Sequence, residues 1–246
     1  PTRSVNGLPG AHYWQNRADY TIDATLDPKA KTITASETIA YTNNSPDTLD
    51  SLWLQLDQNI YRPDARAHFG ADRGKGELDG HTNGYTIDAV EVEQGGKRTL
   101  AGFLVTDTRM EVRLPAPLAA KGGTLRLHMR YRYTIPGAFG GRTAWGKAKA
   151  GEIYDIAQWY PRMAVYDDLR GWDTLPYLAQ EFYLEYGDFD YRVTLPADML
   201  VAGPGELLNP EEVLSATERA RLEQARRSDA TVTIGGAAEA AQAAAR

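Results

Sequence analysis

The chain has 246 residues, a net charge of −6 and a hydrophobic content of 42%. This length can bury a sizeable core, as one large all-β domain or as two small domains. The Lys and Arg residues are dispersed and the net charge is negative, which excludes an obvious nucleic-acid or anionic-membrane partner. The absence of cysteine excludes disulfides, thiolate metal sites and a cysteine nucleophile. No apolar run approaches the roughly 18 residues of a membrane span, and no targeting segment is recognisable.

The first half of the chain is typical of antiparallel strands joined by turns. In residues 19–26 every second side chain is apolar, which predicts a half-buried strand. The turn residues Asp27–Lys31 follow, and alternation resumes over Thr32–Thr42, so the pair predicts a β-hairpin. Further strands are predicted at Leu52–Leu56, Tyr85–Val92, Leu100–Thr106, Arg109–Leu114 and Thr124–Ile135.

The strand at Thr124–Ile135 has two chemically different faces. Leu125, Leu127, Met129, Tyr131 and Tyr133 alternate with Arg126, His128, Arg130 and Arg132. The cationic face fits a solvated outer sheet face better than an anion site.

Residues 58–84 are polar and rich in glycine, which predicts a long loop that contains His68 and His81. The chain's other histidines, His12 and His128, are far from these in sequence. None of the four forms H-E-x-x-H or His-x-His, so no zinc site within the chain is expected.

The C-terminal part mixes strands with one helix. Strands are predicted at Glu181–Tyr186, Tyr191–Leu195 and Thr231–Ile234. A surface helix is predicted over residues 210–226, with Asn209 as N-cap, Pro210 at its first position and Glu212 completing a capping box. We expect residues 1–234 to form one β domain with this helix inserted, followed by an alanine-rich tail over 235–246.

Aromatic residues concentrate between Tyr154 and Tyr191, and the run Asp155–Asp168 lies at the centre of this region. Proline lacks a backbone donor and keeps its predecessor extended, so Pro161 predicts a strand leaving a sheet edge. Gln158 and Tyr160 would lie on one face and Trp159 on the other. We interpret this run as the lip of a binding surface.

No catalytic constellation stands out. Glu181 and Glu185 on one strand would be about 13 Å apart, whereas a glycosidase pair needs roughly 5–9.5 Å. A partner among Asp167, Asp168 and Asp173 stays open. No Gly-x-Ser-x-Gly occurs, and Gly137–Arg142 lacks the spacing of a phosphate-binding loop. The chain's own residues therefore favour a non-catalytic role.

Several segments, in order, resemble the N-terminal β domain of the gluzincin zinc aminopeptidases, the family of aminopeptidase N and leukotriene hydrolase. The segments are Tyr20–Asp27 with Ile33–Glu37, Leu52–Leu56, Leu114–Leu118 before Leu125–Tyr133, Ala157–Asp168, Glu181–Tyr183 and Val201–Leu207. The last three are closest to a bacterial branch of that family.

The resemblance implies a saddle-like or sandwich β domain that packs beside a thermolysin-like catalytic domain. A short segment would reach the active site and hold the N-terminal amine of a peptide substrate, with Gln158 and Tyr160 in the reaching positions. Family members commonly carry Glu or Gln where this chain has Tyr160. A phenol carries no full negative charge at neutral pH, so Gln158 is the stronger candidate. Trp159, Pro161 and Arg162 are candidates for the domain interface.

The family's zinc ligands and general base would lie in a catalytic domain of the same polypeptide, so no cofactor is expected in this segment and zinc is implied for that domain. We expect the segment alone to be inactive. A bacterial periplasmic and a cytoplasmic location both stay open. The alternative is a free-standing β-sandwich module that binds a sugar or peptide by stacking on Trp159, Tyr160, Trp172 and Tyr177.

Overall fold

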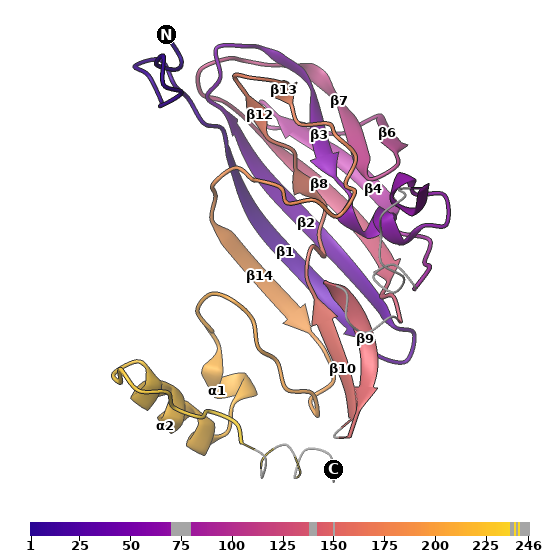
Figure 1. Cartoon of the computed structure of the whole chain (residues 1–246), viewed down its shortest axis with the longest axis vertical. Coiled ribbons are helices and arrows are strands. Elements are labelled where there is room, and N and C mark those ends of the chain that lie inside the picture. Colours follow the sequence, from indigo (N-terminus) through magenta and orange to yellow (C-terminus); the bar gives the residue numbers. More distant parts are fainter. Residues whose placement is uncertain (70–79, 138–141, 150, 237–238, 240, 242–246) are drawn as a thin grey trace. The chain divides into compact units, whose positions relative to one another are not determined.

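The structure is a computed structural model, and it describes residues 1–69, 80–137, 142–149, 151–236, 239 and 241. Across these residues β-strands predominate, accompanied by two 3-10 helices and two α-helices (Figure 1). The strands form a six-stranded sheet, a four-stranded sheet and two two-stranded sheets, and most neighbouring strands are antiparallel. The predicted all-β fold class, with one surface helix near the C-terminus, is confirmed.

The six-stranded sheet has the strand order β14-β1-β2-β8-β4-β5. The strand bounds are Arg17–Asp27 for β1, Thr32–Asn43 for β2, Thr86–Gln94 for β4, Lys97–Leu100 for β5, Gly123–Thr134 for β8 and Phe189–Thr194 for β14. β1 and β2 form the predicted hairpin. Its turn is closed by Asp27 Oδ1, which accepts hydrogen bonds from the backbone N–H groups of Lys29 at 2.8 Å and Ala30 at 3.0 Å.

β8 has the two faces that its alternation predicts. Every apolar side chain on its inner face is at most 4% exposed: Leu125, Leu127, Met129, Tyr131 and Tyr133. On the outer face, Arg126 and His128 lie 3.7 and 2.9 Å from the carboxylate of Glu93, and Arg132 pairs with Asp88. Acidic residues of β4 therefore neutralise much of the cationic face, as on a solvated outer surface.

The four-stranded sheet has the order β11-β3-β7-β6, with bounds Arg162–Met163, Leu49–Gln55, Arg109–Leu118 and Phe103–Thr106. The single strand predicted over Leu100–Thr106 is wrong, because β5 and β6 belong to different sheets. Ala101 N donates to Val90 O of the large sheet, whereas Gly102 O accepts from Arg113 N of the small one. Ala101 is therefore bonded to the six-stranded sheet and Gly102 to the four-stranded sheet. The chain passes from one sheet to the other between these two residues.

β14 pairs in parallel with β1, with Phe189 opposite Tyr20 and Val193 opposite Ala24. It confirms the strand predicted at Tyr191–Leu195, but it begins two residues earlier. The strand predicted at Glu181–Tyr186 is wrong, since only Tyr186 makes a strand-type bridge there, with Arg17. The remaining short strands are β9 (Thr143–Ala148) with β10 (Gly151–Ile156) and β12 (Tyr166–Asp167) with β13 (Gly171–Trp172).

The loop predicted over residues 58–84 contains regular structure where it is described. A 3-10 helix, η1, spans Asp57–Tyr61, and a second, η2, spans Arg66–Phe69. Residues 70–79 lie outside the described part of the chain, as do most of the predicted connector at 137–142 and much of the tail at 235–246.

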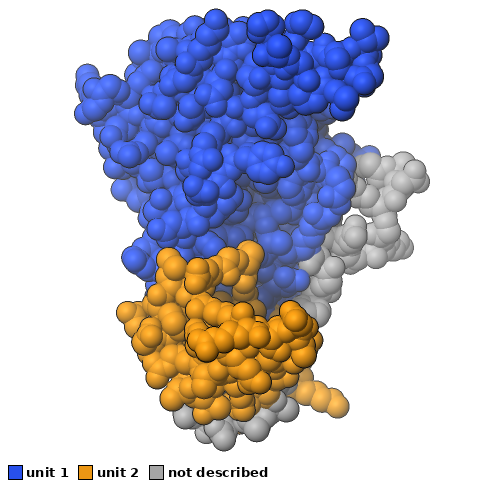
Figure 2. Space-filling model, turned by 90° about the vertical axis from the view of Figure 1, so that its left-hand side faces the viewer, with its two compact units in different colours: residues 1–146, 154–194 blue, residues 147–153, 195–246 orange. Residues whose placement is uncertain are grey.

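The chain divides into two compact units, coloured blue and orange in Figure 2. The first comprises residues 1–146 and 154–194, and the second comprises residues 147–153 and 195–246. All the buried hydrophobic residues of the described chain lie between Ala18 and Tyr177, so the hydrophobic core belongs to the first unit.

The second unit carries the predicted helix as two pieces, α1 (Pro210–Val213) and α2 (Ala216–Ala225). Asn209 makes no side-chain cap hydrogen bond; the capping box is formed instead by Ser215 and Glu218, which start α2. No residue of α1 or α2 is buried, as expected for a surface helix. The strand predicted at Thr231–Ile234 is wrong, because the described residues there form no ladder. No helix in the described ranges has the length and apolar character required to span a bilayer.

Candidate functional site

The segment Ala157–Pro161 links two strands and has no regular structure of its own. β10 ends at Ile156, and β11 begins at Arg162, where it pairs with β3. The extended strand predicted through this segment is wrong, because Gln158 adopts the left-handed conformation with φ +51°. The strain of that conformation, about 1–3 kcal/mol for a residue other than glycine, must be offset by contacts around it.

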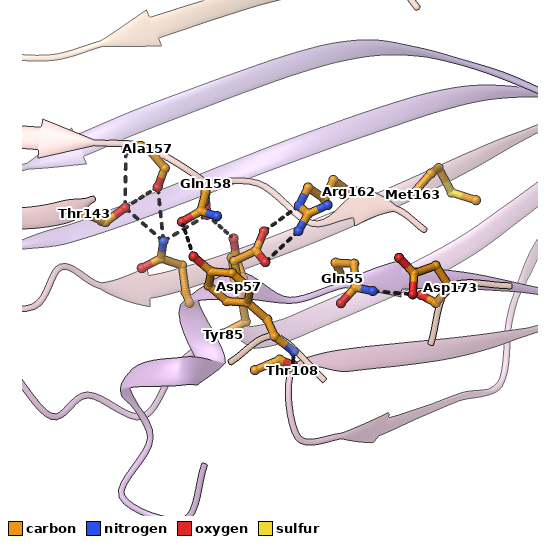
Figure 3. A network of polar contacts seen from close by, with 12 residues as sticks. Gln55, Asp57, Tyr85, Thr108, Thr143, Ala157, Gln158, Arg162, Met163 and Asp173 are labelled. Carbon is orange, nitrogen blue, oxygen red and sulfur yellow. Dashed lines mark hydrogen bonds and ion pairs between the residues drawn. The ribbon is translucent and has the colours of Figure 1, made fainter. Parts of the chain in front are cut away.

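Gln58 of η1 provides those contacts. Its side chain is buried, and its Nε2 donates to Gln158 O at 2.9 Å, to Ala157 O at 3.4 Å and to Thr143 Oγ1 at 3.1 Å (Figure 3). The Tyr85 hydroxyl also donates to Gln158 O, at 3.4 Å. The carbonyl groups of Ala157 and Gln158 are therefore held by Gln58 of η1, and that of Gln158 is also held by Tyr85, the residue before β4.

The Gln158 side chain has a partner at its oxygen. Its Oε1 accepts a hydrogen bond from the Tyr177 hydroxyl at 3.2 Å. Its Nε2 is buried and has no hydrogen-bond partner within the described ranges. The residue as a whole is half-buried, so this segment is neither sealed in the core nor fully free.

Tyr160 lies in a group of aromatic rings at the edge of the large sheet. Its ring centroid is 5.3 Å from that of Tyr20, 5.8 Å from Phe189 and 5.4 Å from Trp159. Trp159 extends the group to Tyr191, at 6.5 Å. Burial raises the pKa of Tyr160 to about 12, so the phenol stays neutral at physiological pH and offers a hydroxyl rather than a charge.

Arg162 and Pro161 are buried within the chain. The Arg162 guanidinium makes a two-pronged ion pair with Asp57, Nε to Oδ2 at 2.6 Å and Nη2 to Oδ1 at 2.9 Å. Its charged end also lies 3.8 Å from the centre of the Phe182 ring. This pairing supplies the hydrogen-bond acceptors and the counter-charge that a buried guanidinium needs. Any effect of Arg162 and Pro161 on an interface would therefore act through the neighbouring Trp159 and Tyr160.

The residues that shape the segment were missed by the sequence analysis. Asp57, Gln58 and Asn59 are consecutive, at most 2% exposed, and each binds a distant part of the chain. Asn59 accepts from the backbone N–H of Tyr85 at 2.8 Å and donates to Asp107 O at 2.8 Å. Their polarity is typical of a loop. The apolar residues on both sides, Leu56, Ile60 and Tyr61, indicate instead that this part of the chain stays in the core.

A cavity of about 260 Å³ lies beside this network, lined among others by Gln55, Arg162, Asp173, Tyr177, Phe182 and Tyr183. Gln55 Nε2 donates to the backbone oxygen of Asp173 at 2.9 Å (Figure 3). Tyr177 therefore touches both the cavity and Gln158.

The carboxylates considered for glycosidase chemistry are engaged separately. Glu181 pairs with Arg142 at 2.7 Å, and Asp168 pairs with Arg3 at 2.8 Å. Asp167 accepts from the Tyr183 hydroxyl, and burial raises the pKa of Glu185 to about 7. Glu181 and Asp173 both line the cavity of about 260 Å³, and Glu181 is held there by its ion pair with Arg142.

The histidines are also dispersed, apart from one pair. The rings of His68 and His81 lie 4.9 Å apart, and His128 contacts Thr38 and Glu93. In the part of the chain that is described, no three His, Asp or Glu side chains are grouped so that they could hold a metal ion.

Comparison with known proteins gives similarities at the level of structure. No protein-family model matches the chain, and no curated protein matches it. Solved structures to which the chain is similar include an M1 zinc metallopeptidase from Deinococcus radiodurans, with a TM-score of 0.40 and 19% identity. A mutant of that protein bound to a Tyr-Ser-Ala substrate has a TM-score of 0.41 and 21% sequence identity. Native leukotriene A4 hydrolase from Saccharomyces cerevisiae has a TM-score of 0.30 and 10% identity, and the similarity covers 48% of this chain and 15% of that one.

The two bacterial similarities cover 78% of this chain and 35% of each of those chains. This chain thus spans about a third of the length of these metallopeptidase structures.

Proposed function

We propose that this chain is the non-catalytic N-terminal β domain of a zinc metallopeptidase of the aminopeptidase type. In this role it docks on a catalytic domain of the same polypeptide and forms one wall of the substrate cleft. The zinc and its chemistry belong to that catalytic domain: a polarised carbonyl, an activated water and an anchored substrate terminus. The proposal starts from the ordered sequence resemblance that ends in Ala157–Asp168 and Val201–Leu207.

The observation that carries the proposal is an uncovered apolar face beside Gln158–Tyr160. The inner side of β1 is buried, with Tyr20, Ile22 and Ala24 at most 6% exposed. Their register partners on β14, Phe189, Tyr191 and Val193, are 48%, 38% and 38% exposed. The core face of the sheet therefore continues into an open aromatic surface, which is typical of a site where another protein surface packs.

The structure gives less support to the alternative function, a free-standing module that binds its ligand by stacking on aromatic rings. Of its four rings, Tyr177 is buried, and Trp172 packs instead with Tyr166 and Tyr41, at 5.2 and 6.2 Å. Of the four rings, only Trp159 and Tyr160 are neighbours, and both are half-buried.

The test is made on the longest polypeptide that the gene encodes. We expect H-E-x-x-H and a downstream Glu beyond residue 246, and cleavage of aminoacyl chromogenic substrates by that protein. Gln158→Ala should lower its kcat/KM about tenfold, the effect of one lost hydrogen bond of roughly 1–1.5 kcal/mol. Gln224→Ala, an exposed glutamine of α2, is the matched control and should leave kcat/KM unchanged. A gene that ends here, or equal kcat/KM values for Gln158→Ala and the control, would contradict the proposed role.

The isolated 246-residue chain provides a second test. We expect it to bind no stoichiometric zinc in elemental analysis after dialysis and to cleave no aminoacyl chromogenic substrate. One tightly bound zinc per chain would place metal chemistry in this segment and overturn the proposal.

A further inference from the structure

A hollow of about 220 Å³ opens on the outer face of the six-stranded sheet. It extends over the neighbouring strands β2, β8, β4 and β5, and Arg130 of β8 lies at its centre. Ser36 of β2 and Ala89 of β4 are the register partners of Arg130 on either side, and the register of β4 on β8 shifts next to Ala89. The short side chains of Ser36 and Ala89 therefore leave a depression around Arg130.

Arg130 is the exception on a face whose other cations are neutralised. Arg126 and Arg132, on the same side of β8, pair with carboxylates of β4. Arg130 lies opposite Ala89 instead, and its guanidinium makes no ion pair and no hydrogen bond within the described residues. Its five N–H donors are therefore available to a ligand.

Arg98 of β5 brings a second guanidinium group to the hollow. It donates to Glu91 at 2.6 Å. This hydrogen bond holds the pKa of Glu91 below its ordinary value, and the positive charge of Arg130 adds to the effect. Glu37 borders the hollow as well, but its side chain is on the buried face of β2. Two guanidinium groups thus face one carboxylate, which leaves one positive charge unbalanced.

The other acidic groups near the hollow are engaged elsewhere. Glu93 lies 2.9 Å from His128. Asp23 of β1, the register partner of Ser36, lies 3.5 Å from Arg192. Each of these carboxylates already has a partner, so the positive charge at the hollow is not cancelled by them.

We propose that this hollow binds a small phosphate-type oxyanion, held by the guanidinium groups of Arg130 and Arg98 and by the Ser36 hydroxyl. That hydroxyl makes no hydrogen bond within the described part of the chain, so it is available as a donor. Donors from three strands suit a tetrahedral anion, which has an acceptor oxygen for each of them, better than a carboxylate with two oxygens. Guanidinium groups bind phosphate through paired N–H donors. The site is independent of the proposed function.

NMR titration of the ¹⁵N-labelled 246-residue chain with sodium phosphate tests the site. The pH is fixed, and sodium chloride keeps the ionic strength constant. We expect saturable shifts of the amide signals centred on Ser36, Ala89 and Arg130. Sodium acetate should cause the same shifts only at concentrations about tenfold higher. No saturable shift with phosphate, or equal affinity for acetate, would overturn the proposal.

Three variants test the ligands of the anion. Arg130→Gln should weaken phosphate binding about tenfold, because charge-assisted hydrogen bonds are lost. Arg126→Gln is the matched control: it removes the same charge from the same face of β8 but outside the hollow, so the affinity should change by less than about twofold. Glu91→Gln should strengthen phosphate binding, because it frees Arg98 from its carboxylate.

Thermal unfolding checks that each variant folds. Equal weakening by Arg130→Gln and Arg126→Gln would show that phosphate is attracted only by the general positive charge of this face, and it would overturn the proposed site. Weaker binding in Glu91→Gln would also overturn it.

Discussion

The Asp57–Arg162 pair is a buried ion pair at the end of the 157–161 segment. Its side chains are 1% and 5% exposed, so both charges have left water almost completely. Such a pair gives little net stability compared with apolar residues of the same shape. Removing one partner is costly, because it leaves the charge of the other buried and unpaired. The pair therefore fixes where Arg162 begins β11 and, with it, the end of the 157–161 segment.

Asp57→Ala should destabilise the first unit by about 3–5 kcal/mol, because it leaves the Arg162 guanidinium buried without a counter-charge. The double variant Asp57→Ala/Arg162→Met should recover most of that loss. Urea unfolding followed by tryptophan fluorescence measures both. A loss below about 1 kcal/mol for the single variant would mean that Arg162 reaches solvent.

Glu185 gives a pH-dependent prediction. Burial raises its pKa to about 7 in the folded chain, against an ordinary value of 4.5, and one of its oxygens lacks a partner among the described residues. Below pH 4.5 the carboxyl is neutral in both the folded and the unfolded chain, so its contribution to stability is fully present. As the pH rises from 4.5 to 7, the unfolded chain loses the proton first, so the stability that the neutral carboxyl gives is lost.

Glu185→Gln should therefore melt at the same temperature as the wild type at pH 4 and at a higher temperature at pH 8. Thermal unfolding by circular dichroism at pH 4, 6 and 8 measures the difference. A constant difference across that range would show that Glu185 does not titrate in this window.

At the scale of the elements, regular alternation predicts strands, and a short turn predicts the pairing of β1 with β2, but pairings between strands distant in the sequence are not predicted. β1, β2 and β8 follow the pattern of their apolar residues, because each buries one full face. The course of Ala157–Pro161 depends on side chains about 100 residues away, such as Gln58, which no local pattern reveals. The same holds for β14, whose parallel pairing with β1 cannot be read from six residues of alternation. Gln158 could be singled out as a candidate from its motif, but its supports, Gln58 and Tyr177, could not.

The helix caps of the second unit give a prediction on an element. Ser215→Ala should destabilise α2 by about 0.5–2 kcal/mol, because the Ser215 hydroxyl accepts the Glu218 backbone N–H at the helix start. Hydrogen exchange of the amides in residues 216–225 should accelerate accordingly. Asn209→Ala, which removes no cap hydrogen bond, is the control. If Asn209→Ala accelerated the exchange of α2 and Ser215→Ala did not, Asn209 would be the N-cap, as the sequence predicted.

At the scale of the whole molecule, the hydrophobic core lies entirely in the first unit. Because no buried hydrophobic residue of the described chain lies beyond Tyr177, a chain ending at Thr194 should keep its cooperative unfolding. We expect its midpoint to lie within about 5 °C of the full chain's, a loss of roughly 1 kcal/mol or less. Scanning calorimetry of both chains measures this. A truncated chain without a cooperative transition would show that residues 195–246 belong to the same folding unit.

β14 also has a consequence for how this protein is made. Its partner β1 lies near the N-terminus, and Asp188 bonds back to Asp19 across a separation of 169 residues. At roughly 5–20 residues per second, a ribosome needs on the order of ten seconds or more to deliver the strand that covers this edge. Throughout that interval nascent β1 presents an unprotected row of amide groups, which invites pairing between neighbouring chains. Crowded polysomes are therefore where this protein should most need a chaperone.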